Sequence, residues 1–123
     1  MPTQILSQTQ THQKIRRLAY QVYENHFEET ELYLVGIESM GLHLARLLQT
    51  YLQEISPLKI YLESIKIDKT NPLEAPIVLS KPIETFKNQN IILIDDVLNS
   101  GKTMFYALKP FFEIPIKKLQ TLV

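Results

Sequence analysis

Two adjacent carboxylates, Asp95 and Asp96, directly follow the apolar run Ile91 to Ile94. A short polar turn comes next, with a glycine and two hydroxyl residues: Ser100, Gly101 and Thr103. A turn of this kind that opens a helix can bind a phosphate through backbone N–H groups and the helix dipole. Carboxylates beside a phosphate are suited to sugar hydroxyls or to Mg²⁺. The pattern therefore predicts a site for a phosphorylated sugar.

A second turn of the same kind lies earlier in the chain. A buried-strand candidate, 32–37, passes through Glu38-Ser39-Met40-Gly41 into apolar residues at helical spacing over 44–52. The three glycines of the chain all lie at these two turns: Gly36, Gly41 and Gly101. Glycine lets the backbone turn sharply or approach another group closely. Two such turns in one small sheet predict a shared ligand site.

The elements that must position these turns are those of an α/β protein. Apolar runs predict strands at 32–37, 59–67, 91–95 and 118–123, separated by helices in most places. Periodicity predicts a helix over 14–24, with candidate N-caps at Ser7, Thr9 and Thr11. We therefore expect a mostly parallel central sheet flanked by helices. The right-handed crossover rule places the ends of strands 32–37 and 91–95 at the same edge.

Two segments depart from regular structure. Residues 68–82 contain several turn-forming residues and a short strand candidate, 77–79, so we expect a flexible loop or protruding hairpin there. Pro110 falls inside the helical pattern that starts near Met104. Proline removes a hydrogen bond and clashes with the preceding turn, so it should kink or shorten this helix.

The composition limits the class of protein. A chain of 123 residues is expected to form a single domain, 1–123. Thirteen basic residues balance thirteen acidic ones, which gives no net attraction to nucleic acid or to an anionic membrane. Cysteine is absent, which excludes disulfides and thiolate metal sites. No apolar run approaches the roughly 20 residues of a membrane span, and no secretory signal is seen, so we expect a cytoplasmic location.

Several other sites can be weighed against the sugar-phosphate reading. Gly101-Lys102-Thr103 matches the end of a Walker A motif, but Asp96 stands where that motif needs glycine. No G-x-G-x-x-G follows a strand, which excludes a Rossmann dinucleotide site. A receiver-like or HAD-like site could use the two carboxylates, but it would not explain the turn after them. The histidines form no constellation and are expected to be ordinary helix or surface residues: His12, His26 and His43.

Residues 91–103 resemble the phosphoribosyl pyrophosphate motif of type I phosphoribosyltransferases: four hydrophobic residues, two acids, a hydrophobic residue, two variable residues, then Ser/Thr-Gly-x-Thr. Residues 35–45 are similar to the pyrophosphate-loop region of the same family. They are closest to the branch of the bifunctional pyrimidine-operon regulator and uracil phosphoribosyltransferase. The helix at 14–24 and residues 119–123 are also similar to that branch, so the resemblance covers nearly the whole chain, with 68–82 matched least.

The resemblance implies roles for particular residues. Asp95 and Asp96 would be the catalytic carboxylates, which hold the ribose hydroxyls directly or through Mg²⁺. The 5-phosphate would lie in the loop formed by Asn99, Ser100, Gly101, Lys102 and Thr103. The pyrophosphate would contact the loop formed by Glu38, Ser39, Met40 and Gly41. The 68–82 segment would close over the reacting centre and exclude water.

The implied activity is transfer of phosphoribose from phosphoribosyl pyrophosphate to a nucleobase, a pyrimidine such as uracil being favoured, with release of pyrophosphate and with Mg²⁺ as cofactor. The resemblance also implies a homodimer or higher homo-oligomer. RNA is a further partner for which zero net charge gives no support.

Two departures from the family pattern modify this expectation. Glu38 and Met40 stand where the branch usually carries basic side chains. Relatives normally continue past 118–123 with further strands and a hood that reads the base, so we expect this domain to lack them. Glu38 and Met40 motivate an alternative hypothesis, a non-catalytic sensor or regulator that binds phosphoribosyl pyrophosphate or a nucleotide on the same fold, and the expected lack of the later strands motivates a third, a structural fragment without activity.

Overall fold

The computed structural model of the chain describes residues 8–38, 40–67, 77–95 and 101–122. The elements along the chain are α1 (Gln8–His26), β1 (Glu31–Ile37), α2 (Met40–Ile55), β2 (Lys59–Lys66), β3 (Val78–Leu79), η1 (Ile83–Phe86), β4 (Asn90–Ile94), α3 (Gly101–Leu108), η2 (Lys109–Glu113) and β5 (Lys118–Leu122). The two η elements are short 3₁₀ helices.

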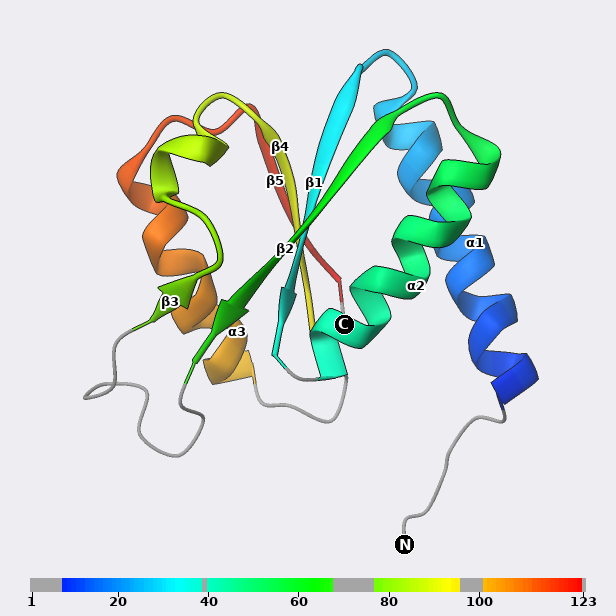
Figure 1. The fold of residues 1–123 in the computed structure, drawn as a ribbon, viewed down its shortest axis with the longest axis horizontal. Helices are drawn as coiled ribbons and strands as arrows, with labels where there is room; N and C mark the ends of the chain where they lie inside the picture. Colours follow the sequence, from blue (N-terminus) through cyan, green and yellow to red (C-terminus); the bar gives the residue numbers. More distant parts are fainter. Residues whose placement is uncertain (1–7, 39, 68–76, 96–100, 123) are drawn as a thin grey trace, which may run out of the picture.

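One five-stranded sheet, in the order β3-β2-β1-β4-β5, forms the middle layer. The four longer strands run parallel, and β3 is antiparallel to β2. Helices α1 and α2 cover one face of this sheet, and α3 with the two 3₁₀ helices covers the other (Figure 1). The predicted mostly parallel sheet with flanking helices is confirmed.

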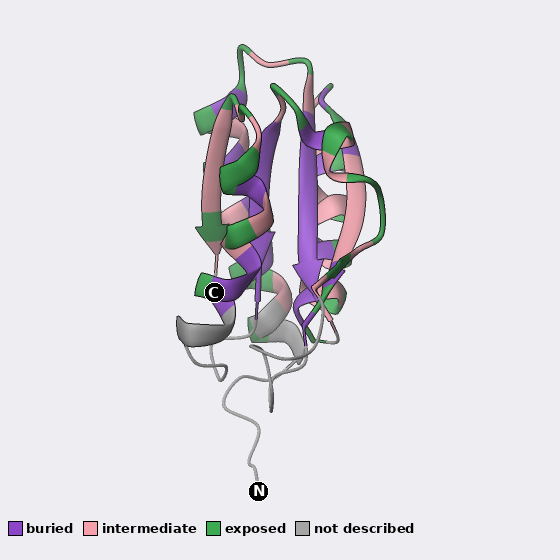
Figure 2. Ribbon diagram, turned by 90° about the vertical axis from the view of Figure 1, so that its left-hand side faces the viewer, coloured by how far each residue is buried: buried purple, intermediate pink, exposed green. Residues whose placement is uncertain are grey.

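The central strands have no solvent-exposed face. All five residues of β4 and six of the seven residues of β1 are buried, and Figure 2 shows these strands enclosed between the helical layers. Alternate residues of each strand therefore enter two separate cores. Leu32 and Leu34 pack on the α1–α2 side, whereas Tyr33 and Val35 pack toward α3. Continuous apolar runs rather than alternating ones are what such strands require.

Helix α1 is longer than the predicted 14–24, because it begins at Gln8 and ends at His26. The N-cap prediction is wrong for Thr9 and Thr11, which lie inside the helix, and Ser7 lies outside the described residues. The early turns pack on α2, where His12 Nδ1 lies 2.9 Å from the Tyr51 hydroxyl. This tertiary contact gives the polar start of the helix a partner that its periodicity does not reveal.

Pro110 shortens the third helix, as predicted. Helix α3 ends at Leu108, and the chain continues as the 3₁₀ helix η2 with proline in its first turn. In the 68–82 segment, β3 pairs with β2 as a short antiparallel hairpin, while residues 68–76 lie outside the described part. No helix among the described residues is long and apolar enough to cross a membrane.

Candidate functional site

The two turns singled out in the sequence leave the sheet at neighbouring carboxyl ends. Strands β1 and β4 are adjacent and parallel, and Gly36 is paired with Ile94 in their register. Glu38 follows β1 before α2 begins at Met40, and Asp95 follows β4 before α3 begins at Gly101. The prediction that these two strands end at the same edge of the sheet is confirmed. Ligands in open α/β sheets bind at this edge.

Gly41, in the first turn of α2, lies directly against the end of β4. A Cβ atom at this position would overlap the carbonyl oxygen of Ile94 and would lie 3.0 Å from the Cα and 3.3 Å from Oδ1 of Asp95. Real Cβ atoms do not approach backbone so closely, so only glycine fits here without a shift. This contact brings the predicted pyrophosphate loop against the first acid of the predicted sugar-phosphate motif.

Gly36 makes the same kind of close approach inside the first turn. A Cβ there would overlap Cα of Leu42 and would lie 2.7 Å from the Leu42 nitrogen and 2.8 Å from the Gly41 oxygen. Neither of these two glycines has a positive φ angle. Glycine is therefore needed at both positions because a side chain would not fit. The absence of a side chain lets the amino end of α2 pack closely against the ends of β1 and β4.

Among the residues predicted to bind the sugar phosphate, 95, 96 and 99–103, only Asp95 has a described side chain. It is almost fully buried, with 1% of its surface exposed. Its backbone N–H donates to the carbonyl oxygen of Leu122 in β5, at 3.0 Å. Asp96, Asn99 and Ser100 lie outside the described residues. The backbone of Gly101, Lys102 and Thr103 forms the first turn of α3, and their side chains are also outside the described part.

The predicted pyrophosphate loop is described at three of its four residues. The Glu38 backbone N–H donates to the carbonyl oxygen of Ile65 at 3.0 Å, which ties the turn to β2, and its side chain is half-buried. Met40 is 46% exposed, and Ser39 lies outside the described residues. Glu38 is thus held at the edge, close to the amino end of the 16-residue helix α2, where partial positive charge favours an anion.

Sequence reasoning did not identify Ile94 as part of this edge, although its carbonyl oxygen is the atom that Gly41 approaches most closely. Every residue has a backbone carbonyl, so the role of this one cannot be read from the type of residue at position 94. The sequence indicates the contact only through Gly41, the glycine that faces it.

Two residues with a shifted pKa, His26 and Glu29, lie at the other end of the sheet. Burial lowers the pKa of His26, at the carboxyl end of α1. Hydrogen bonds from Lys117 and Asn90 lower the pKa of Glu29. Among the described residues, no three His, Asp or Glu side chains are gathered as a metal cage. Mg²⁺ does not need such a cage, because it usually keeps several waters and uses one or two carboxylates with substrate phosphates.

The chain matches a known family over most of its length. The family model "Phosphoribosyl transferase domain" matches residues 2–115. The chain is 29% identical over 101 residues to the Bifunctional protein PyrR of Clostridium novyi, covering 77% of this chain and 57% of that protein. It is also 29% identical over 113 residues to the Bifunctional protein PyrR of Actinobacillus pleuropneumoniae, covering 85% and 62%. The chain thus spans about three fifths of the length of these relatives.

Solved structures share the fold at low sequence identity. The hypoxanthine-guanine phosphoribosyl transferase of L. donovani superposes with a TM-score of 0.81 at 15% identity, over 98% of this chain and 70% of that chain. The hypoxanthine phosphoribosyltransferase of Trypanosoma cruzi gives the same TM-score at 12% identity, over 98% and 69%. These likenesses show the fold. Because the family model matches residues 2–115, the chain belongs to the phosphoribosyl transferase domain family.

Proposed function

We propose that this domain binds 5-phosphoribosyl 1-pyrophosphate with Mg²⁺ at the carboxyl edge of β1 and β4 and transfers phosphoribose to a nucleobase, releasing pyrophosphate. The observation that carries the proposal is the contact of Gly41 with Ile94 and Asp95. Gly41 belongs to the loop proposed for pyrophosphate and Asp95 to the motif proposed for the sugar phosphate, so this contact supports the proposal. One ligand that carries both groups would span the two turns.

In this proposal each turn holds one part of the ligand. Asp95 and Asp96 hold the ribose hydroxyls or Mg²⁺, and residues 99–103 bind the 5-phosphate at the start of α3. Residues 38–41 contact the pyrophosphate at the start of α2. Both phosphate groups would then meet helix amino ends, which attract anions.

The chemistry of Asp95 and Asp96 fits Mg²⁺, because this ion prefers one or two carboxylates and takes its other ligands from water and substrate phosphates. When bound, the ion supplies charge stabilisation for the departing pyrophosphate. The chain's own contribution is to fix the sugar between the two turns and to hold the leaving group in line with the incoming base nitrogen. Positioning of this kind can account for much of a rate enhancement without a general acid or a nucleophile.

We propose a pyrimidine such as uracil as the base, because the loop at 35–45 resembles the branch of the pyrimidine regulator and uracil phosphoribosyltransferase.

The proposal has three further parts. The chain forms a single domain over 1–123, the 68–82 segment closes over the reacting groups, and the protein assembles as a homodimer or larger homo-oligomer.

The central experiment is calorimetric titration of the purified chain with phosphoribosyl pyrophosphate, with and without Mg²⁺. We expect Mg²⁺-dependent binding that is lost in Asp95→Asn/Asp96→Asn. A matched control, Glu24→Gln/Glu54→Gln, removes the same charge from exposed helix positions and should bind normally. Because Asp95 is buried, Asp96→Asn alone is included, with circular dichroism to confirm folding. Unchanged affinity in both folded variants would overturn the site assignment.

A second candidate function is a sensor that binds the same ligand without turnover. Glu38 and Met40 in the pyrophosphate loop favour it, because a carboxylate near pyrophosphate opposes the developing charge of the leaving group. The relatives that carry the name Bifunctional protein PyrR also combine two functions. An assay of pyrophosphate release across a panel of nucleobases separates the two candidates. Release with one base identifies an enzyme, and binding without release with any base identifies a sensor.

A further inference from the structure

Two buried side chains at the amino end of the sheet carry acceptor atoms that lack a donor. His26, the last residue of α1, is 1% exposed, and Asn90, the first residue of β4, is 3% exposed. Among the described residues, none supplies a hydrogen bond to His26 Nε2 or to Asn90 Oδ1. Buried polar atoms in folded proteins nearly always have a partner, either in the protein or in ordered water. Each of these two atoms therefore needs a donor.

The hydrogen bonds that these side chains already make identify both atoms as acceptors. His26 Nδ1 lies 2.8 Å from the Val22 carbonyl oxygen, which can only accept, so Nδ1 carries the ring proton and Nε2 presents a lone pair. Asn90 Nδ2 donates to Glu29 Oε1 at 3.1 Å and to the Glu31 carbonyl oxygen at 3.4 Å. Because both of these oxygens accept, the orientation of the amide is fixed, and its free atom is the oxygen.

Both side chains enter the space between α1 and the sheet. His26 continues the buried stripe of α1 that includes Ala19 and Val22, at helical spacing. In β4, Ile92 packs on the α1–α2 side, and residues two apart share a face of a strand, so Asn90 lies on that side too. Helix α1 ends at the end of the molecule where β1, β4 and β5 begin (Figure 1). The two acceptors therefore share one side and one end of the sheet.

Glu29 and Lys118 connect the two side chains. The Glu29 N–H donates to the His26 carbonyl oxygen at 2.9 Å, and the Glu29 carboxylate accepts from Asn90. Lys118 is paired with Asn90 in the register of β4 and β5, and its Nζ donates to the Asn25 carbonyl oxygen at 2.9 Å. After burial and a backbone hydrogen bond, the charges of Lys118 and Glu29 also shift the pKa of His26, so both lie near its ring. We call these four residues the amino-end cluster: His26, Glu29, Asn90 and Lys118.

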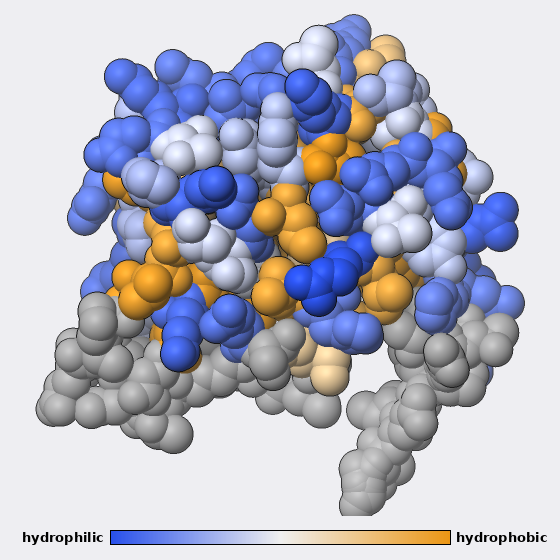
Figure 3. Space-filling view, viewed as in Figure 1, coloured by the Kyte–Doolittle hydropathy of each residue, from blue (hydrophilic) through white to orange (hydrophobic). Residues whose placement is uncertain are grey.

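The amino-end cluster is suited to a small neutral donor. Two acceptors require two hydrogens, and water is the smallest molecule that supplies both. The charges of Lys117, which is paired with Glu29, and of Lys118 oppose an ammonium ion or another cation. The surface at this end is mainly hydrophilic on the face shown in Figure 3, but His26 and Asn90 are buried beneath the surface of the protein. Bulk solvent therefore does not satisfy them.

Lys118 can supply the third bond that a buried water usually makes. Its ammonium group has three hydrogens, and the Asn25 carbonyl oxygen takes one of them. A second hydrogen is available for the water oxygen. Buried waters typically make about three hydrogen bonds to otherwise unsatisfied groups. Two accepting atoms and one donating group match that number.

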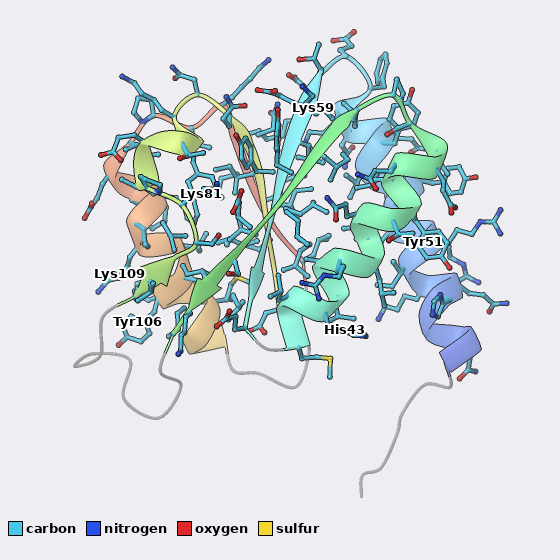
Figure 4. The ribbon with its side chains drawn as sticks, in the orientation of Figure 1. His43, Tyr51, Lys59, Lys81, Tyr106 and Lys109 are labelled. Atoms are coloured by element: carbon cyan, nitrogen blue, oxygen red, sulfur yellow. The ribbon has the colours of Figure 1, made fainter. Side chains whose placement is uncertain are left out.

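We infer that the amino-end cluster holds one buried water, which donates to His26 Nε2 and to Asn90 Oδ1 and accepts from Lys118 Nζ. The water joins the end of α1 to the beginnings of β4 and β5. In Figure 4, Lys59 labels the end of the molecule that holds this cluster, and His43 labels the end near the candidate functional site. The inference is therefore independent of the proposed function, and its test needs no ligand.

The test detects the water in the parent chain by NMR, at a pH where the imidazoles are neutral. The His26 Hδ2 proton is bonded to the carbon beside Nε2 and lies away from Nδ1, so a cross-peak between it and the water resonance reports on this site. We expect a cross-peak of opposite sign in laboratory-frame and rotating-frame spectra, which indicates a long-lived water. His43, exposed on α2, is the internal control and should show no such water. Nitrogen-15 spectra should show Nδ1 of His26 protonated and Nε2 accepting.

Asn90→Leu removes one of the two acceptors at nearly the same volume and should abolish the His26 cross-peak. The matched control, Gln53→Leu, removes an exposed amide from α2 and should keep it. If Asn90→Leu does not fold, Lys118→Met replaces it, at a half-buried position, and should weaken the cross-peak because the water loses its donor.

Three results would overturn the inference. The first is a parent chain without a long-lived water at His26 Hδ2. The second is a His26 ring with its proton on Nε2, which would then be a donor. The third is a cross-peak that stays unchanged in the folded variant, because the water would then not be shared among the residues of the amino-end cluster.

Discussion

Gly41 is the residue on which the geometry of the site depends most directly. Its α-carbon lies where any side chain would meet the Ile94 carbonyl and the Asp95 backbone. The constraint is one of space, since neither Gly36 nor Gly41 has a positive φ angle. A methyl group at this position must push α2 away from β4 and so widen the gap between the two turns.

Gly41→Ala should therefore lower the free energy of unfolding by about 1–3 kcal/mol, the usual cost of overpacking, although alanine is the better helix former. Urea denaturation measures this change. The matched control is Gln53→Ala, an exposed position of the same helix, which should stay within about 0.5 kcal/mol of the parent. Equal stability of Gly41→Ala and the control would show that α2 does not press on β4.

The site residues show what sequence can and cannot predict at this scale. The glycines could be identified because all three lie at the two strand–helix turns, and the two acids because adjacent carboxylates directly follow a buried apolar run. The burial of Asp95 could not be predicted, because it depends on β5 and α2, which come from distant parts of the chain. The Ile94 carbonyl left no signal in the sequence at all.

His26 is a buried residue whose charge state should affect stability. Its Nδ1 lies 2.8 Å from the Val22 carbonyl oxygen, which can only accept, so Nδ1 carries the proton of the neutral ring. Burial is the main cause of its lowered pKa, and nearby Lys118 also lowers it. The folded protein thus resists a second proton that the unfolded chain accepts near its ordinary pKa of 6.5. Stability is full above that pH and is lost as the pH falls below it.

Urea denaturation between about pH 7.5 and pH 5 should show this loss. In His26→Gln, the fall in the free energy of unfolding over this range should be smaller than in the parent. His43→Gln is the matched control because His43 is exposed on α2, and it should keep the parent's pH dependence. If His26→Gln and the parent fall in parallel, burial of the neutral imidazole is not the cause.

At the scale of elements, β2 is a long strand with only a two-residue neighbour, β3, on its outer side. Side chains complete the pairing there. The Ser80 hydroxyl accepts a hydrogen bond from the Ser64 N–H at 2.8 Å and donates one to the Glu63 carboxylate at 2.8 Å. Further along, Gln49 donates to the Ile60 carbonyl oxygen. These contacts protect an exposed strand edge, which would otherwise be open to pairing with another chain.

Ser80→Ala should open this edge. The Ser64 amide should exchange with deuterium faster, because its acceptor is gone, and the free energy of unfolding should fall by about 0.5–1 kcal/mol. Thr50→Ala is a suitable control, since it removes an exposed hydroxyl that bonds only within α2. Unchanged protection of the Ser64 amide in Ser80→Ala would mean that the backbone bond from Ser80 to Ser64 suffices.

Elements whose patterns are local could be predicted well. The apolar runs predicted both ends of each of the four parallel strands to within one residue, and Pro110 marked the end of α3. The start of α1 could not be predicted, because its polar first turns are held by a tertiary contact between His12 and Tyr51. Threonines that look like caps in isolation lie inside the helix for this reason.

At the scale of the whole molecule, ligand binding should be visible as added stability. A ligand that binds only the folded state at about 100 times its Kd adds about 2.7 kcal/mol. Phosphoribosyl pyrophosphate with Mg²⁺ should therefore raise Tm by several degrees, and EDTA should remove most of the rise. Inorganic phosphate with Mg²⁺ serves as the control and should have a much smaller effect. A rise that is insensitive to EDTA would contradict the assignment of Mg²⁺.

The order of the strands, β3-β2-β1-β4-β5, is a property of the whole molecule that could not be predicted from the pattern of residues along the chain. The crossover rule fixed the handedness of the connections and the shared edge, and it left the neighbours of each strand open. Two separate cores decide the order, because each central strand must contribute alternate residues to both. That requirement becomes visible only when all the helices are placed.

The hydrogen bond from the Asp95 amide to the Leu122 carbonyl oxygen has a consequence for biosynthesis. The motif that follows β4 is translated well before β5, yet the end of β4 gains this partner only after β5 has been made and has docked. A nascent chain that has emerged through α3 would carry the acids and the phosphate turn without the strand that holds them. The ribosome-bound domain should therefore acquire ligand affinity late, in a single step, when β5 joins the sheet.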